Sequence, residues 1–559
     1  MSTVTQIPRL HKVGNTWELL VDGQPYLILG GELQNSSLSS YRYMDTVWDK
    51  ISRTGVNTVL GGVGWEEIEP EEGSFDFTNL STVIEGAREH DIRLILLWFG
   101  SWKNGKSTYA PSWVKRNPER FPRMYYKDKF GRPKNSGVLS VFSNECSQAD
   151  AKAFSKMLDF IAENDKQRTV IMVQVENEPG FHHSARDHSA IATNLFSSSV
   201  PRDLVNFLTE DWNALHPHLK ENLAKFKTSD FTKEGSLPSW EDTFGVSVWT
   251  DELFMAYHYA LYVERVASAG RERYSLPLYT NVWLAGPSEQ GIGPATGGAK
   301  PGEYPSGGGV STVLDIWQKF APTLDFIAPD LYHAQTDEEC EIYKHKGQAL
   351  FIPEQRRDDF GGRRLWVPIG SHKALGTSPF GIDTQTASEL VLAESYQLLG
   401  SVASHVLEAR RKSKKIVGIA FEHPPPAGMK DPTPAVKVRW TAYELTISRA
   451  FTLGIQGPGY GLVIEQSPTT FLLIGKGFKV EWKSNDKNLA YTDIIRFTEK
   501  SVSASGALTS ERWLNGDETQ HGAFANMPNN RPDQGEEWVP VTIPARTAIA
   551  EVEVFSIED

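Results

Sequence analysis

The sequence predicts an α/β protein, a (β/α)8 TIM barrel followed by a C-terminal antiparallel β-sandwich-like domain. Over most of the first 414 residues, short apolar runs alternate with amphipathic helix-like segments. This alternation is typical of a parallel sheet covered by helices. From about residue 415 the pattern changes to short strands separated by turns, which is typical of antiparallel sandwiches. We therefore expect two domains, residues 1–414 and 415–559.

Eight apolar runs in the first domain have the length of buried strands. A hairpin around Asp22-Gly23 precedes the first of them. The eight runs are residues 27–34, 56–65, 93–102, 169–178, 276–284, 324–332, 349–355 and 374–380. Eight strand–helix units in this span favour a closed barrel. The segment after the first run, LGGELQNSS, lacks the G-x-G-x-x-G turn of a doubly wound nucleotide-binding sheet, which weakens that alternative.

The segments between the runs have different predicted roles. Residues 41–55, 149–165 and 252–270 are amphipathic and predict helices. Two long insertions, 103–148 and 181–250, follow the third and fourth runs, and insertions of this length usually form functional walls or lids.

Composition excludes several classes of protein. A net charge of -13 without a basic run argues against nucleic-acid and anionic-membrane partners. The presence of two cysteines argues against a disulfide framework. The N-terminus MSTVTQIPRL has no apolar signal region, and no 18-residue apolar run occurs elsewhere. These features predict a cytoplasmic protein.

The fourth run ends in VQVENEPG, residues 173–180, which crowds carboxyl groups at a strand end. Strand alternation places Gln174, Glu176 and Glu178 on one face and Asn177 on the other. Alone, this segment is compatible with a salt-bridged strand end, and alternation does not separate Glu176 from Glu178.

A second glutamate, Glu354, ends the seventh run in ALFIPEQ. In a barrel the carboxyl ends of all strands meet on one face, so Glu178 and Glu354 would face each other there. Glycoside hydrolysis needs such a pair, one carboxylate to attack the anomeric carbon and one acid to protonate the departing oxygen. The pair therefore favours a glycosidase.

Four segments together resemble glycoside hydrolase family 35, the β-galactosidases. They are VDGQPYLILGGELQ, GVGWEEIEPEEGSFDF, QVENEPG and FIPEQ. The chain departs from the family in LLWFGSWKNG on the third strand, in Pro179 after the strand-four glutamate, and in the Pro-Glu-Gln of the seventh. These departures indicate a divergent branch and leave the sugar specificity open.

The resemblance implies roles by position. Glu178 would be the general acid/base and Glu354 the nucleophile of a retaining enzyme. Asn177 would bind the sugar 2-hydroxyl, and Tyr332 would orient the nucleophile. Two further residues, Glu32 and Trp102, would line the sugar subsite. Trp283, at the end of the fifth strand, offers a stacking surface.

We expect neither a metal nor a cofactor. FHHSARDH, residues 181–188, groups three histidines and an aspartate but lacks the spacing of known metal motifs. The resulting hypothesis is a retaining exo-β-galactosidase acting on terminal β-galactosides, with a homo-oligomer compatible with the sequence. The alternatives are a β-glucosidase or transglycosylase, and an inactive sugar-binding barrel, which should have lost one of the two glutamates.

Overall fold

The computed structural model describes residues 6–227, 237–286, 297–332, 336–384, 390–426, 428–450, 456–529 and 546–558. The chain begins with a small antiparallel sheet of β1 (Arg9–Val13), β2 (Thr16–Val21) and β3 (Gln24–Tyr26). Asp22 and Gly23 connect β2 to β3 with positive φ angles of 51° and 74°, as a tight hairpin turn requires. The predicted hairpin is confirmed.

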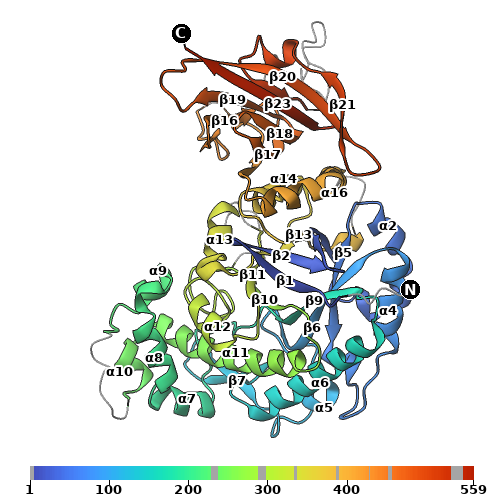
Figure 1. The fold of residues 1–559 in the computed structure, drawn as a ribbon. Coiled ribbons are helices and arrows are strands. Elements are labelled where there is room, and N and C mark those ends of the chain that lie inside the picture. Colours follow the sequence, from blue (N-terminus) through green and yellow to red (C-terminus); the bar gives the residue numbers. More distant parts are fainter. Residues whose placement is uncertain are drawn as a thin grey trace.

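Eight parallel strands form the barrel (Figure 1). In chain order they are β4 (Ile28–Glu32), β5 (Thr58–Gly64), β6 (Arg93–Lys103), β9 (Val170–Asn177), β10 (Leu278–Val282), β11 (Phe326–Pro329), β12 (Ile352–Gln355) and β13 (Gly376–Pro379). Hydrogen-bonded pairs link all neighbours except β11 and β12. That last seam is closed by a parallel bridge between Leu331 and Gln355 and by the Leu331 amide, which donates to the Glu354 carbonyl at 2.8 Å.

Each barrel strand falls within one predicted run, except that β6 extends one residue further, to Lys103, so the predicted barrel is confirmed. The runs lack polar alternation because both faces of the strands are buried. On β6, for example, Ile95 and Leu97 belong to the cluster inside the barrel, whereas Leu96 and Trp98 pack in the layer between strands and helices. Leu19 of β2 joins the inner cluster, so the N-terminal sheet contributes side chains to the barrel interior.

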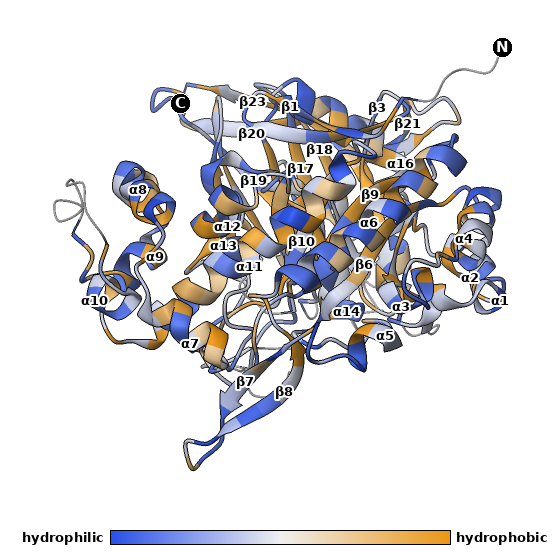
Figure 2. Cartoon of the chain, turned by 90° about the horizontal axis from the view of Figure 1, so that it is seen from below, coloured by the Kyte–Doolittle hydropathy of each residue, from blue (hydrophilic) through white to orange (hydrophobic). Residues whose placement is uncertain are grey.

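Helices cover the barrel, with their hydrophilic sides outward (Figure 2). The longest are α4 (Thr78–Glu89), α6 (Asn144–Asn164), α11 (Val248–Arg271) and α16 (Leu390–Arg411). Within the predicted segment 41–55 the helix is interrupted, since α1 (Tyr41–Met44) and α2 (Trp48–Ser52) are separate. Shorter helices are α3 (Trp65–Ile68), α12 (Leu314–Phe320), α13 (Thr336–Ile342), α14 (Asp359–Arg364) and α15 (Trp366–Gly370).

The two insertions have regular structure. The first contains α5 (Ser112–Lys115) and a hairpin of β7 (Arg123–Lys127) and β8 (Pro133–Leu139) that projects from the body (Figure 2). The second contains α7 (Ala190–Ser197), α8 (Arg202–Glu210), α9 (Pro217–Asn222) and α10 (Trp240–Phe244), which form a lobe on one side of the barrel (Figure 1). Part of the Gly/Pro-rich segment 288–309 lies outside the described residues.

The C-terminal part is a sandwich of two antiparallel sheets, as predicted. The larger sheet comprises β14 (Ile416–Phe421), β17 (Gly459–Ser467), β18 (Thr470–Lys476), β23 (Ile549–Ile557), β20 (Tyr491–Val502) and β21 (Leu508–Trp513). The smaller comprises β15 (Val436–Arg439), β16 (Tyr443–Arg449), β19 (Phe478–Ser484) and β22 (Ala525–Met527). A second hydrophobic cluster lies between the two sheets.

The larger sheet packs on barrel helices through its outer face. The Trp366 and Tyr460 rings stack with centroids 5.5 Å apart, and Arg363 pairs with Glu422. Leu462 and Ile474 belong to the same buried cluster as α16 residues. The division at residues 414 and 415 stays a prediction. None of the helices in the described ranges has the length and apolarity needed to span a bilayer, and a cytoplasmic location stays a prediction.

Candidate active site

Glu354 lies at the C-terminal end of barrel strand β12 and is 6% exposed. The Tyr332 hydroxyl donates to Glu354 Oε2 at 3.0 Å, and Asn281 Nδ2 donates to Oε1 at 3.3 Å. Both carboxylate oxygens therefore accept hydrogen bonds from side chains of neighbouring strand ends. These bonds fix the orientation of the carboxylate.

The end of β9 departs from regular strand geometry and separates its two glutamates. Glu176 and Glu178 have positive φ angles of 62° and 46°, which are rare for residues other than glycine. Glu176 turns to the outer layer, where its oxygens accept from the amides of Ser101 at 3.2 Å and Trp102 at 2.7 Å. The expectation that Glu176 and Glu178 share a face was wrong, because the left-handed residues break the alternation.

Glu178 lies on the Glu354 side of the strand end. Carboxylate oxygens of Glu178, Asp330 and Glu354 all lie within 4.8 Å of one another. Asn281 connects the three groups, because its Oδ1 accepts from the Glu178 amide at 2.8 Å while its Nδ2 donates to Asp330 Oδ2 at 2.9 Å and to Glu354. The Asn281 side chain thus forms hydrogen bonds to all three residues, Glu178, Asp330 and Glu354.

Burial and like charges raise the pKa values of three acids of the site, Glu178, Asp330 and Glu32. Burial, followed by the charge of Glu354, raises the pKa of Glu178 to about 7. The same two causes, in that order, hold the pKa of Glu32 well above its usual range. Lys103 is the cation of the cluster; burial lowers its pKa, but the charges of Glu354, Glu178, Glu32 and Asp330 outweigh burial and raise it.

Several buried polar atoms around this cluster have no hydrogen-bond partner among the described residues. They are both carboxylate oxygens of Glu32, both amide atoms of Asn177, Glu178 Oε2 and Trp283 Nε1. Asn177 is the parallel register partner of Lys103, so its side chain lies beside that lysine. Unsatisfied buried polar groups are costly, and their concentration at one barrel mouth is what a polar ligand such as a sugar requires.

Trp102 does not join this group. Its ring packs against Tyr262 and Tyr259 of α11, with centroids 4.4 and 4.8 Å away, and is fully buried. The prediction that Trp102 lines the sugar subsite is therefore wrong, because the side chain points outward from the barrel, as that of Trp98 does. Lys103, the next residue, occupies the site instead.

Trp283 lies at the rim of the site. The His182 ring meets Trp283 edge-on with centroids 5.1 Å apart, and Lys106 Nζ lies 2.7 Å from His183 Nε2. Burial, followed by the charges of Lys106 and His183, lowers the pKa of His182 to about 4, so this ring is neutral near pH 7. Trp283 and these histidines follow the ends of β10 and β9, the strands that carry Asn281 and lead to Glu178.

No metal is assigned to the histidine segment or to the acids. The Asp187 carboxylate accepts hydrogen bonds from the Tyr125 amide, the Ser189 amide and the Ser189 hydroxyl, and not from the neighbouring histidines. Within the described ranges, the single group of acids close enough to hold a cation is that of Glu178, Asp330 and Glu354. Lys103 already supplies positive charge there.

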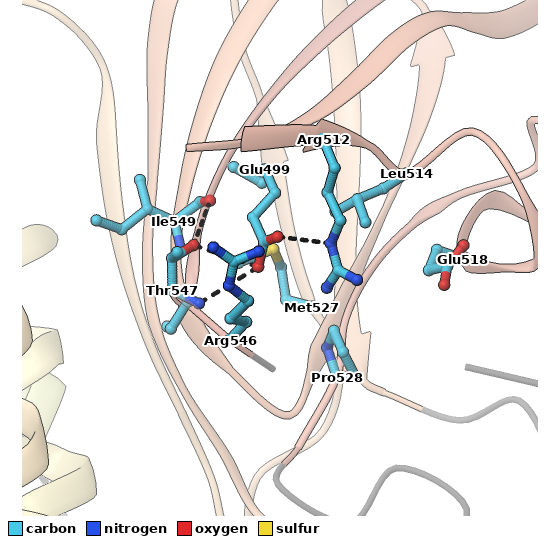
Figure 3. Close-up of a pocket in the computed structure, with 12 residues that line it drawn as sticks. Glu499, Arg512, Leu514, Glu518, Met527, Pro528, Arg546, Thr547 and Ile549 are labelled. Atoms are coloured by element: carbon cyan, nitrogen blue, oxygen red, sulfur yellow. Dashed lines mark hydrogen bonds and ion pairs between the residues drawn. The ribbon is translucent and has the colours of Figure 1, made fainter. Parts of the chain in front are cut away.

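A pocket in the C-terminal domain offers a contrast (Figure 3). Its buried Glu499 accepts from Arg512 at 2.6 Å, and Arg546 pairs with Glu511 at 3.0 Å. Each of these two glutamates is therefore paired with an arginine. The barrel mouth, where oxygens and amides lack partners, is the better candidate for chemistry.

Three residues of the site, Lys103, Asn281 and Asp330, were not predicted from the sequence. A signal was available for two of them. Asn281 and Asp330 each stand two positions before a predicted strand-end residue, Trp283 and Tyr332, and residues two apart on a strand share a face. For Lys103 the sequence gave no such signal. Strand alternation places Trp102 and Lys103 on opposite faces but does not tell which of the two faces the site.

Comparison with known proteins identifies related families over parts of the chain. Residues 39–228 match the sequence model of family 42 glycoside hydrolases, described as β-galactosidases. Residues 392–526 match a domain of unknown function, DUF5597. The chain is similar to β-galactosidases. The assignment to family 35 is not supported, because the matching model is that of family 42.

Curated relatives match short stretches. A β-galactosidase of Xanthomonas manihotis is 28% identical over 185 residues, which are 31% of this chain and 27% of the relative. An exo-β-D-glucosaminidase of Thermococcus kodakarensis is 34% identical over 112 residues, 18% of this chain and 14% of the relative. The matched stretches thus span about a quarter and a seventh of those proteins. Together with the family match they indicate a glycoside hydrolase.

Two solved structures match about two thirds of the chain at low sequence identity. The catalytic domain of a β-amylase from Paenibacillus polymyxa is 14% identical, with a TM-score of 0.45 over 66% of this chain and 96% of that one. A β-galactosidase from Bacillus circulans sp. alkalophilus is 15% identical, with a TM-score of 0.44 over 68% of this chain and 57% of that one.

Proposed function

We propose that this protein is a retaining exo-β-galactosidase that hydrolyses terminal β-D-galactosides through a glycosyl-enzyme intermediate. The observation that carries the proposal is the pair of carboxyl groups Glu178 and Glu354, with oxygens within 4.8 Å across the barrel mouth. Retaining glycosidases hold their two carboxyl groups about 5–5.5 Å apart, whereas inverting enzymes need about 6.5–9.5 Å to admit a water.

The environments of the two glutamates support different roles. Glu354 is oriented by Tyr332 and Asn281, as suits a nucleophile whose oxygen must reach the anomeric carbon. Glu178, whose pKa is raised to about 7, is suited to hold a proton near neutral pH.

The reaction then takes two displacements. Glu354 forms a bond to the anomeric carbon as the glycosidic bond breaks, and the Glu178 proton passes to the leaving oxygen. Glu178, now ionised, takes a proton from water as that water attacks the anomeric carbon and releases Glu354. Asn177, with both amide atoms unpartnered, would bind the sugar 2-hydroxyl and strengthen that bond in the transition state. Glu32 and Trp283 would contact the remainder of the sugar.

Substitution of Glu354 tests the nucleophile. Glu354→Gln should lower kcat by at least about 10³-fold with the fold retained. Glu354→Gly supplied with azide should form a glycosyl azide of inverted anomeric configuration. Full activity of Glu354→Gln would overturn the assignment.

Substitution of Glu178 tests the acid/base. Glu178→Ala should harm substrates with poor leaving groups far more than activated aryl glycosides, because a good leaving group needs no proton. Equal losses on both kinds of substrate would contradict the role.

A second candidate substrate is a 2-amino-2-deoxy-β-glycoside. Both carboxylate oxygens of the buried Glu32 lack a hydrogen-bond partner among the described residues, as an acceptor for a sugar ammonium group would, and one relative is named as a glucosaminidase. Rates on aryl β-galactoside, β-glucoside, β-fucoside and β-glucosaminide would rank these specificities. Transglycosylation would appear as products longer than the substrate. A homo-oligomer stays a prediction.

A further inference from the structure

We propose that Lys103 and Glu32 together bind the 3-hydroxyl of the sugar whose glycosidic bond is broken, with Lys103 as the donor and Glu32 as the acceptor. This inference rests on the proposed function, since it requires the sugar to lie between Glu178 and Glu354. It names a substrate class that the proposed function leaves open, namely glycosides whose 3-hydroxyl is free.

Both side chains point into the barrel mouth. Glu32 ends strand β4 and stands four residues after Ile28, which belongs to the cluster inside the barrel, so the two share a face. Lys103 ends β6, and its Nζ lies 5.3 Å from the ring centroid of Phe99, another member of that cluster. Glu32 is 1% exposed and Lys103 is 8% exposed. Two side chains of opposite charge are thus buried at the same end of the barrel.

Neither charged group is paired within the part of the chain that the structure describes. Both oxygens of Glu32 are buried without a hydrogen bond. Lys103 Nζ forms no hydrogen bond with a described residue and no ion pair of 4.0 Å or less with a described acid, Glu32 included. Buried charges without partners are costly. A hydroxyl placed between the two would satisfy both, because it donates one hydrogen bond and accepts others.

Strand β5, which separates β4 from β6 in the sheet, leaves space for such a hydroxyl. Leu60 of β5 belongs to the cluster inside the barrel, so the inward positions nearer the mouth are Gly62 and Gly64. Neither carries a side chain beyond the Cα atom. β5 therefore places no side chain between Lys103 and Glu32 at these two positions.

The strand order directs the sugar ring toward this space. Between the strands of the two catalytic glutamates, one side of the barrel is β9-β10-β11-β12 and the other is β9-β6-β5-β4-β13-β12. The shorter side is occupied by Asn281 and Asp330, which are hydrogen-bonded to each other at 2.9 Å. A sugar whose anomeric carbon lies between the glutamates therefore extends over the longer side, which carries Lys103 and Glu32.

The position of Asn177 identifies the hydroxyl. Asn177 is the parallel register partner of Lys103, so the two side chains start from neighbouring strands about 4.8 Å apart. Asn177 is assigned above to the 2-hydroxyl, and both of its amide atoms are unpartnered. The next hydroxyl along a pyranose ring, away from the anomeric carbon, is the 3-hydroxyl. It is therefore the hydroxyl within reach of Lys103 when Asn177 holds its neighbour.

A buried donor and acceptor select for a free hydroxyl. A glycoside without the 3-hydroxyl leaves both charged groups unsatisfied, and sites built around a substrate hydroxyl strongly reject analogues that lack it. A 3-O-alkyl or 3-O-glycosyl group has no O–H to donate to Glu32. The 3-hydroxyl has the same orientation in galactose and in glucose, so this contact does not distinguish these two sugars.

The experiment measures kcat/KM of the wild type, Lys103→Met and Glu32→Leu on three aryl β-glycosides with one leaving group. These are the galactoside, its 3-deoxy analogue and its 6-deoxy analogue. On the galactoside and the 6-deoxy analogue each variant should lose about 10- to 100-fold, as expected for one hydrogen bond to a charged group. On the 3-deoxy analogue the loss should be at least about tenfold smaller, because the hydroxyl that the side chain contacts is already missing.

Lys479→Met is the matched control. Lys479 lies on β19 of the C-terminal sandwich, with its Nζ 4.3 Å from the ring centroid of Phe524. The variant thus removes an ammonium group from an aromatic ring, as Lys103→Met does, but in the other domain. Its kcat/KM should equal that of the wild type on all three substrates.

Other outcomes overturn the proposal. Equal losses on all three substrates would show that Lys103 acts only through its charge on the acids. A loss that shrinks on the 6-deoxy analogue and not on the 3-deoxy analogue would place the contact at a different hydroxyl. Should Lys103→Met fail to fold, Glu32→Leu alone decides, because the same pattern is expected of it. Wild-type protein inactive on every glycoside would refute the proposed function instead.

Discussion

The Tyr332 hydroxyl offers a direct test of how the nucleophile is held. In Tyr332→Phe the ring stays and one hydrogen bond is lost, that of 3.0 Å to Glu354 Oε2. The other partner, Asn281, bonds the opposite oxygen at 3.3 Å, so it does not replace the lost donor. Glu354 is then free to rotate away from its attacking position.

The size of the effect follows from the type of bond. A hydrogen bond to a charged acceptor contributes about 1.5–3 kcal/mol, and each 1.36 kcal/mol is a factor of ten in rate. We expect kcat/KM to fall about 10- to 100-fold, measured with an aryl β-glycoside. Single-turnover release of the aryl group should slow by the same factor, because formation of the glycosyl-enzyme is the affected step.

A matched control exists at the opposite end of the barrel. The Tyr26 hydroxyl donates to the Asn57 carbonyl, also at 3.0 Å, just before strand β5. Tyr26→Phe should lower thermal stability with no change in kcat/KM. A loss smaller than about threefold in Tyr332→Phe, or equal losses in both variants, would refute the orienting role of Tyr332.

Three further predictions concern the acids. Glu176→Ala leaves the Ser101 and Trp102 amides without an acceptor, so the free energy of unfolding in urea should fall by about 2–5 kcal/mol. If Glu176→Ala instead lost activity mainly on substrates with poor leaving groups, as is expected of Glu178→Ala, that result would contradict the structural role. The pKa of about 7 for Glu178 predicts that kcat/KM decreases about tenfold per pH unit above that value, and a flat profile to pH 9 would contradict it. Because the pKa of Glu32 is higher in the folded than in the unfolded protein, its protonation stabilises the fold. This stabilisation is complete below the ordinary pKa of 4.5 and is lost as the pH rises through the pKa of the folded state. The melting temperature of the wild type minus that of Glu32→Gln should therefore decrease from pH 4.5 upward, and a constant difference would count against it.

The sequence by itself determined the architecture. Strands buried on both faces need apolar side chains at every position, so all eight barrel strands were visible as runs, and Asp22-Gly23 marked the hairpin by its backbone preference. Glu178 and Glu354 were candidates because a carboxyl group at the end of an apolar run is unusual and parallel strand ends meet. These are local properties, which sequence carries directly.

The tertiary structure decided which side chains meet. Left-handed backbone at Glu176 and Glu178 sends one glutamate outward and the other into the site, which alternation could not show. Packing of the Trp102 ring on α11 leaves Lys103 to face the acids. Asp330 and Asn281 become part of the site only when barrel closure brings their strand ends to Glu178 and Glu354. Side-chain direction at a strand end depends on such long-range contacts, and the same contacts bring together the charged groups on which the proposed chemistry depends.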